Sequence, residues 1–149
     1  CQLDPDAPVK WQVTEGQSAS GQHSLYFGNS EAGTYDDPGK AVGGFAVSPA
    51  FTLYPCLTAN LKVSLFLDVE FFKPTVNWLD YFAILAVDSA GTHHELWNKQ
   101  AWYEEFGITG QESQYGTWVE IDVPLSTDAL PDLAGQQIQL NTPTMYAKR

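Results

Sequence analysis

Residues 61–70 alternate apolar and polar side chains, and this period of two limits the fold more than any other feature of the chain. The apolar positions share one side: Leu61, Val63, Leu65, Leu67 and Val69. The opposite side is polar at Lys62, Ser64, Asp68 and Glu70, with Phe66 as the exception. Successive side chains of a β-strand point to opposite faces, so this pattern predicts a strand with one buried face. Such a face must pack against a second layer.

Other segments predict further short strands: 11–14, 24–27, 45–47, 81–87, 93–97, 118–123 and 137–140. Turn-forming residues separate them, and residues 81–87 are apolar throughout, as in a central strand covered on both faces. We expect long loops at 29–44 and 98–116, no long helix around Pro131, and no strong pattern after Leu140. The prediction is all-β: a two-sheet antiparallel sandwich over residues 11–149, preceded by a linker or edge segment at 1–10. A closed barrel is the alternative.

Acidic residues dominate the charge of the chain. It has 18 Asp and Glu against 7 Lys and Arg, a formal net charge of -11. A nucleic-acid partner is excluded, because no basic patch could neutralise phosphates. Membrane insertion is not expected either, since no apolar run approaches the roughly 20 residues that span a bilayer.

Calcium is the cofactor that these acids suggest, because it prefers carboxylate and carbonyl oxygens. The candidate ligands are Asp36 and Asp37 in the glycine-rich loop, and Glu70 and Asp80 beside a strand connection. No EF-hand spacing is present. Solvated loop acids that confer solubility are the competing interpretation.

The chain has two cysteines, Cys1 and Cys56, too few for a structural zinc site. A disulfide between them would stabilise the fold by about 4 kcal/mol on the chain-entropy model and would imply an oxidising compartment. A lipid-modified Cys1 is the alternative, and we favour the disulfide.

Catalytic patterns are weak. Carboxylate pairs that a glycosidase could use occur at Glu70 with Asp80 and at Glu104 with Glu105, but adjacent loop acids are usually just solvated. The chain has neither a Gly-x-Ser-x-Gly elbow nor a His-Glu-x-x-His motif. Neighbouring His93 and His94 would point to opposite faces of a strand. An enzyme therefore ranks last among the function classes.

Aromatic side chains offer a binding hypothesis, because exposed rings stack on sugars. The candidates are Trp97, Trp102, Tyr103 and Trp118. Core packing is the competing interpretation, and we expect only one or two tryptophans to be exposed.

The order of several short motifs resembles a known family. These are GQHSLYFGN at 21–29, GTYD at 33–36, GGFAVSP at 43–49, HELW at 94–97 and WVEIDVPLS at 118–126. Together they resemble the MAM-like jelly-roll domains of secreted bacterial proteins, including those attached to immune-inhibitor-A-type metallopeptidases, and more distantly the MAM domains of animal receptors.

The resemblance implies a non-catalytic, secreted or cell-surface module for adhesion or protein interaction, which holds neighbouring domains or subunits of a larger assembly. A carbohydrate-binding module is the second hypothesis, and a glycoside-active enzyme is the third. Such domains usually end in a strand rich in Gly, Trp and paired aspartates, and residues 141–146 offer NTPTMY instead. We therefore expect an incomplete sheet with an open edge that a partner strand could extend.

Overall fold

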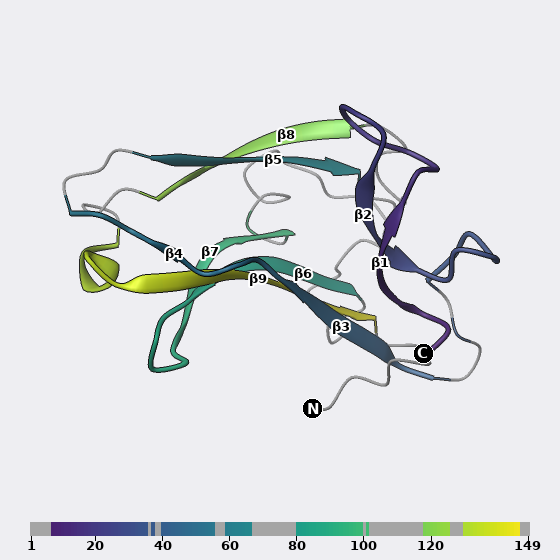
Figure 1. The fold of residues 1–149 in the computed structure, drawn as a ribbon. Coiled ribbons are helices and arrows are strands. Elements are labelled where there is room, and N and C mark those ends of the chain that lie inside the picture. The colour runs from purple at the N-terminus through teal and green to yellow at the C-terminus, as the bar shows by residue number, and fades with distance from the viewer. Residues whose placement is uncertain are drawn as a thin grey trace.

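The structure is a computed structural model that describes residues 7–35, 37, 40–55, 59–66, 80–99, 101, 118–125 and 130–146. Its strands, shown in Figure 1, are β1 (Lys10–Thr14), β2 (Ser24–Gly28), β3 (Val42–Val47), β4 (Phe51–Thr52), β5 (Asn60–Phe66), β6 (Asp80–Val87), β7 (His93–Asn98), β8 (Trp118–Pro124) and β9 (Gln137–Tyr146), with a 3-10 turn η1 (Pro131–Leu133). The predicted all-β class is confirmed. The two-residue β4 was not predicted, and β3 begins earlier than the predicted strand at 45–47.

All strand pairs are antiparallel, and the strands lie in two layers (Figure 1). The larger sheet has the order β3-β9-β6-β7, with β4 also paired to β9. The β5–β8 pair lies over this sheet, and the β1–β2 hairpin stands at one end. Among the described residues, no helix is long and apolar enough to cross a membrane.

The core fills the space between the layers. One cluster joins the hairpin, β6 and β8: Val9, Phe27, Phe82, Ile84, Ile121 and Val123. A second cluster lies toward η1: Leu53, Ala86, Leu125, Leu133 and Ile138. Val9 falls in the predicted 1–10 linker but is only 4% exposed, so the domain already includes this residue.

The alternation at the start of residues 61–70 has the predicted effect. Leu61, Val63 and Leu65 pack against the first core cluster. On the other face, Lys62 Nζ lies 3.3 Å from Glu120 Oε1 and 4.0 Å from Asp122 Oδ2. Residues 67–70, including Glu70, lie outside the described residues.

The predicted strand at 137–140 is too short, because β9 continues to Tyr146 through residues that show no strong pattern in the sequence. Its second half pairs with β3 on one side and β6 on the other. Polar residues and Pro143 interrupt the apolar alternation here, so the sequence pattern does not predict this part of the strand. Proline cannot donate to a ladder, and the β6–β9 pairing indeed skips from Phe82↔Thr144 to Leu85↔Asn141.

Candidate functional site

Only some of the predicted site residues lie within the described part of the chain. The calcium candidates Asp37 and Asp80 and the aromatic candidates Trp97 and Trp118 are described. The remaining predicted site residues lie outside it: Asp36, Glu70, Trp102, Tyr103, Cys1 and Cys56. Their proposed roles, including the disulfide, stay predictions.

Asp80 is the first residue of β6 and is only 5% exposed. The Tyr35 hydroxyl donates to Asp80 Oδ2 at 3.3 Å, so the loop after β2 contacts the start of β6. Asp37 in the same loop forms an ion pair with Lys40 at 3.5 Å. Two of the predicted calcium regions thus meet through Tyr35, although the described residues contain no group of three or more His, Cys, Asp or Glu side chains that could hold a metal ion.

The aromatic candidates Trp97 and Trp118 do not form one binding surface. Trp97 on β7 packs against the first core cluster, with its ring centroid 6.0 Å from that of Phe82 in an edge-on contact. Trp118 on β8 lies opposite Phe66, and their ring centroids are 5.6 Å apart. The two tryptophans belong to different sheets. Phe66, the exception in the alternation of β5, is explained by this cross-strand contact.

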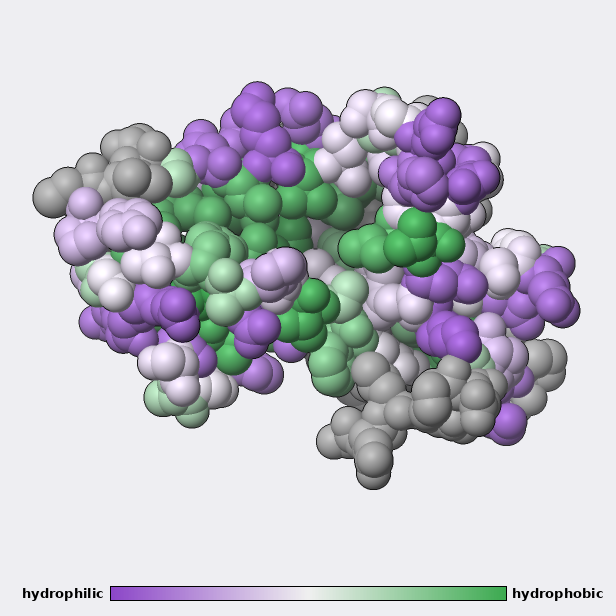
Figure 2. Space-filling view, in the orientation of Figure 1, coloured by the Kyte–Doolittle hydropathy of each residue, from purple (hydrophilic) through white to green (hydrophobic). Residues whose placement is uncertain are grey.

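An exposed apolar site lies on the β1–β2 hairpin, and none of its residues was among the predicted site residues. The Trp11–Phe27 pair packs at the core, whereas the next pair on that face, Val13 and Leu25, is 66% and 60% exposed. Figure 2 shows an apolar patch over this hairpin, surrounded by hydrophilic atoms. The signal was available: Val13 and Leu25 lie two positions from Trp11 and Phe27, on the same face of their strands.

The hairpin face ends in a polar pair of side chains. His23 Nε2 lies 3.1 Å from Glu15 Oε1, and both side chains are more than half exposed. The face therefore grades from core aromatics, through exposed aliphatic residues, to an ionisable pair.

Two further exposed apolar residues, Phe45 and Val47, lie on β3 and are 41% and 46% exposed. They alternate with residues that face the core side, since Gly44 lies against Phe27 and Trp11. They therefore point away from the core. Tyr54 is also exposed, at 63%.

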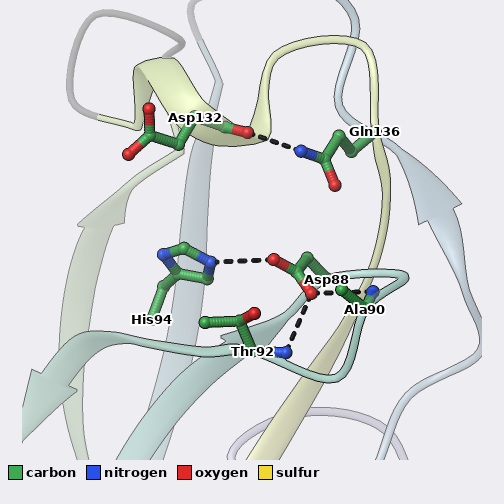
Figure 3. A network of polar contacts seen from close by, with 6 residues as sticks. All are labelled: Asp88, Ala90, Thr92, His94, Asp132 and Gln136. Carbon is green, nitrogen blue, oxygen red and sulfur yellow. Dashed lines mark hydrogen bonds and ion pairs between the residues drawn. The ribbon is translucent and has the colours of Figure 1, made fainter.

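The β6–β7 turn holds a polar network around Asp88, which Figure 3 draws together with a separate contact between Asp132 and Gln136. Asp88 Oδ1 accepts hydrogen bonds from the backbone N–H groups of Ala90 at 2.9 Å and Thr92 at 2.8 Å, and Asp88 Oδ2 lies 3.2 Å from His94 Nε2. The backbone hydrogen bond from Thr92 is the main reason that the pKa of Asp88 lies below its ordinary value. Gly91 completes the turn with φ 82. As predicted for neighbouring strand histidines, His93 is exposed and His94 is half-buried.

Tyr81 and Glu95 form a second polar contact between β6 and β7. The Tyr81 hydroxyl donates to Glu95 Oε2 at 3.4 Å. Partial burial, and then the negative charge of Glu95, raise the pKa of Tyr81. Asn98 Nδ2 also donates to Glu95, at 2.6 Å. The first contact joins neighbouring strands, and the second holds the Glu95 side chain within β7.

No protein-family model, curated protein or solved structure matches the chain. The MAM-like resemblance therefore rests on the motifs of the sequence.

Proposed function

We propose that the chain is a non-catalytic protein-interaction module of a secreted or cell-surface assembly, with a MAM-like jelly-roll sandwich fold. The observation that supports this best is the exposed Val13–Leu25 pair. Exposed apolar groups gathered on one surface and rimmed by polar residues are typical of protein contact sites. The role is adhesion, in which the domain holds neighbouring domains or subunits together.

A carbohydrate-binding module is the second candidate. Sugar sites use exposed aromatic rings with polar groups at their edges. The exposed Tyr54 favours this function, whereas the core packing of Trp97 and the aliphatic character of Val13 and Leu25 favour a protein partner. A glycoside-active enzyme ranks third.

We further propose that calcium stabilises the loop after β2. The contact between Tyr35 and Asp80 supports this proposal, since it joins the strand to the loop that carries Asp36 and Asp37. Calcium at millimolar concentration should raise the melting temperature and a chelator should reverse the rise, because a ligand of the native state stabilises it by mass action. An unchanged melting temperature would remove calcium from the proposal.

Photocrosslinking from position 25 tests the interaction function. A photoreactive amino acid at Leu25, introduced into the protein in cells of its source, should give a discrete protein adduct that an excess of unlabelled domain suppresses. The same amino acid at Ala90, exposed in the β6–β7 turn, serves as the control and should give no such adduct. Absence of a suppressible adduct, together with saturable binding on a glycan panel, would favour the carbohydrate function instead.

A further inference from the structure

Strand β5 has an edge that no other described strand pairs with. Its one partner among the strands that the structure describes is β8. The Leu125 N–H donates to the Ala59 carbonyl at 2.7 Å, immediately before the first paired residues. Since hydrogen-bonded and non-hydrogen-bonded pairs alternate in an antiparallel ladder, this bond fixes the direction of the groups that follow.

The alternation directs the backbone N–H and C=O groups of Leu61, Val63 and Leu65 toward β8. The groups of the intervening residues point away from it, to the free edge: Asn60, Lys62, Ser64 and Phe66. The position of Pro124 is consistent with this alternation of backbone directions. It is opposite Asn60, a position whose N–H is not used between the two strands, so the missing donor of proline costs no bond there.

The free edge of β5 lies beside an apolar band. Figure 2 shows this band on the face turned toward the viewer, between β5 and the larger sheet as they lie in Figure 1. Leu61, Val63 and Leu65 are only partly buried, although their strand alternation directs them to the core. In the described part of the chain, the larger sheet contains five strands and the layer above it contains the two strands β5 and β8. Among the described strands, the smaller layer therefore covers only part of this side of the core.

We propose that β5 accepts an extended strand of a partner protein, one that alternates apolar and basic residues. This inference rests on the proposed interaction function and names its partner class. A strand is the occupant because the free N–H and C=O groups recur at every second residue, and another extended backbone satisfies such a row. The apolar side chains of the added strand cover the band beside Leu61, Val63 and Leu65.

Charge determines the other side of the partner strand. Lys62 is already within 4.0 Å of two carboxylates, and the whole chain carries a formal charge of -11. Ser64 is small and lies opposite Glu120, so a long basic side chain on the added strand can reach across Ser64 to that carboxylate. A second copy of the chain is a poorer occupant, because it carries the same negative charge and would present the same β5 sequence instead of an alternating basic strand.

A peptide of alternating valine and lysine is the probe. We expect saturable binding, with slower hydrogen exchange at the free-edge amides of Lys62 and Ser64. A peptide with the same composition but clustered valines cannot place all of them on one face and should bind weakly. N-methylation of the peptide amides that face β5 should weaken binding by at least about tenfold, since it removes backbone hydrogen bonds and blocks close approach.

Ser64→Pro is the matching change in the protein. The Ser64 N–H points to the free edge, so proline removes the donor without taking a bond from the β5–β8 ladder. The variant should lose peptide binding and keep a melting temperature close to that of the wild type, and Ser64→Thr should still bind. Glu120→Gln should weaken binding of the valine–lysine peptide and leave binding of an alternating valine–serine peptide unchanged.

The outcomes separate this inference from the proposed function. Equal binding of the N-methylated peptide, or exchange protection elsewhere than β5, would overturn the strand site. Self-association in sedimentation that Ser64→Pro abolishes would make a second copy the occupant and overturn the partner assignment. If no peptide binds and crosslinking from position 25 still captures a protein, only the strand site fails. Failure of both experiments removes the interaction function itself.

Discussion

The indole Nε1 of Trp11 donates to Oγ1 of Thr144 at 3.1 Å, and this bond joins the first strand to the last strand across 133 positions of sequence. Thr144 is 5% exposed, and its hydroxyl also donates to the Gly44 carbonyl at 3.1 Å. One buried hydroxyl thus connects β1, β3 and β9. The hairpin that carries Val13 and Leu25 is held on the larger sheet by this contact and by the packing of Trp11.

Thr144→Val should test this connection. Valine keeps the shape of threonine but leaves the Trp11 N–H without its acceptor and removes the hydroxyl donor to the Gly44 carbonyl. We expect a loss of about 1–3 kcal/mol in the free energy of unfolding, measured by urea denaturation. Thr142→Val is the control, since its hydroxyl makes a longer bond of 3.3 Å to Ala46 at a half-buried position, and it should cost less. Equal losses would show that the Trp11 bond carries no special weight.

Gly44 should resist substitution for a steric reason. A Cβ atom at this position would lie 3.0 Å from Phe27 Cε2 and 3.5 Å from Trp11 Cδ1. Gly44→Ala therefore overpacks the contact between β3 and the hairpin, and we expect a loss of about 1–3 kcal/mol in thermal or urea unfolding. Gly16→Ala meets Thr14 Oγ1 at an ordinary 3.4 Å and serves as the control. A neutral Gly44→Ala would mean that the hairpin can shift away from β3.

Thr144 and Gly44 also show which parts of the fold can be predicted from the sequence. Alternation and turn chemistry suffice for β5, β6 and β8, because each strand buries one or both faces in a regular way. The second half of β9 is not predicted from the sequence pattern, because pairing with β3 and β6 makes it a strand despite Pro143 and its polar side chains. Those neighbours are distant in sequence, and the key contact, from Trp11 to Thr144, has no local signature.

The candidate sites follow the same division. Charge and composition point to calcium candidates, and the contact of Tyr35 with Asp80 adds a spatial link that spacing alone does not give. The exposed pair Val13 and Leu25 looks like any apolar strand face in the sequence. Its exposure depends on where the second layer ends, which is a tertiary property. The free edge of β5 is likewise visible only once the strand order is known.

Acid should weaken the β6–β7 turn through Asp88. Its pKa is lowered in the folded protein, chiefly by the Thr92 hydrogen bond, so the folded state favours the ionised carboxylate. That contribution to stability is present above the ordinary pKa of 3.8 and is lost as the pH falls through the lower folded value. Asp88→Asn retains an acceptor oxygen for the turn but cannot titrate.

The comparison is made on urea unfolding at a series of acidic pH values. The wild type should lose more stability than Asp88→Asn as the pH falls below 3.8, and the two should run parallel above it. Other carboxylates titrate in both proteins and cancel in the difference. Parallel curves throughout the acidic range would show that Asp88 is not preferentially ionised in the fold.

The Val13–Leu25 pair should matter to association and not to folding. Both side chains stay largely exposed, so replacing them with threonine removes little buried apolar area. Threonine is also a good strand residue. We expect Val13→Thr with Leu25→Thr to change the free energy of unfolding by less than about 1 kcal/mol in total.

Val63→Thr, on the core side of β5, is the contrasting variant. It should lower the free energy of unfolding more, because it places a hydroxyl against the core. In the source cells, the hairpin double variant should compete poorly against the position-25 crosslink while melting near the wild-type temperature. A double variant that unfolds as readily as Val63→Thr would make the pair a structural element, and full competition by a stable double variant would place the partner elsewhere on the surface.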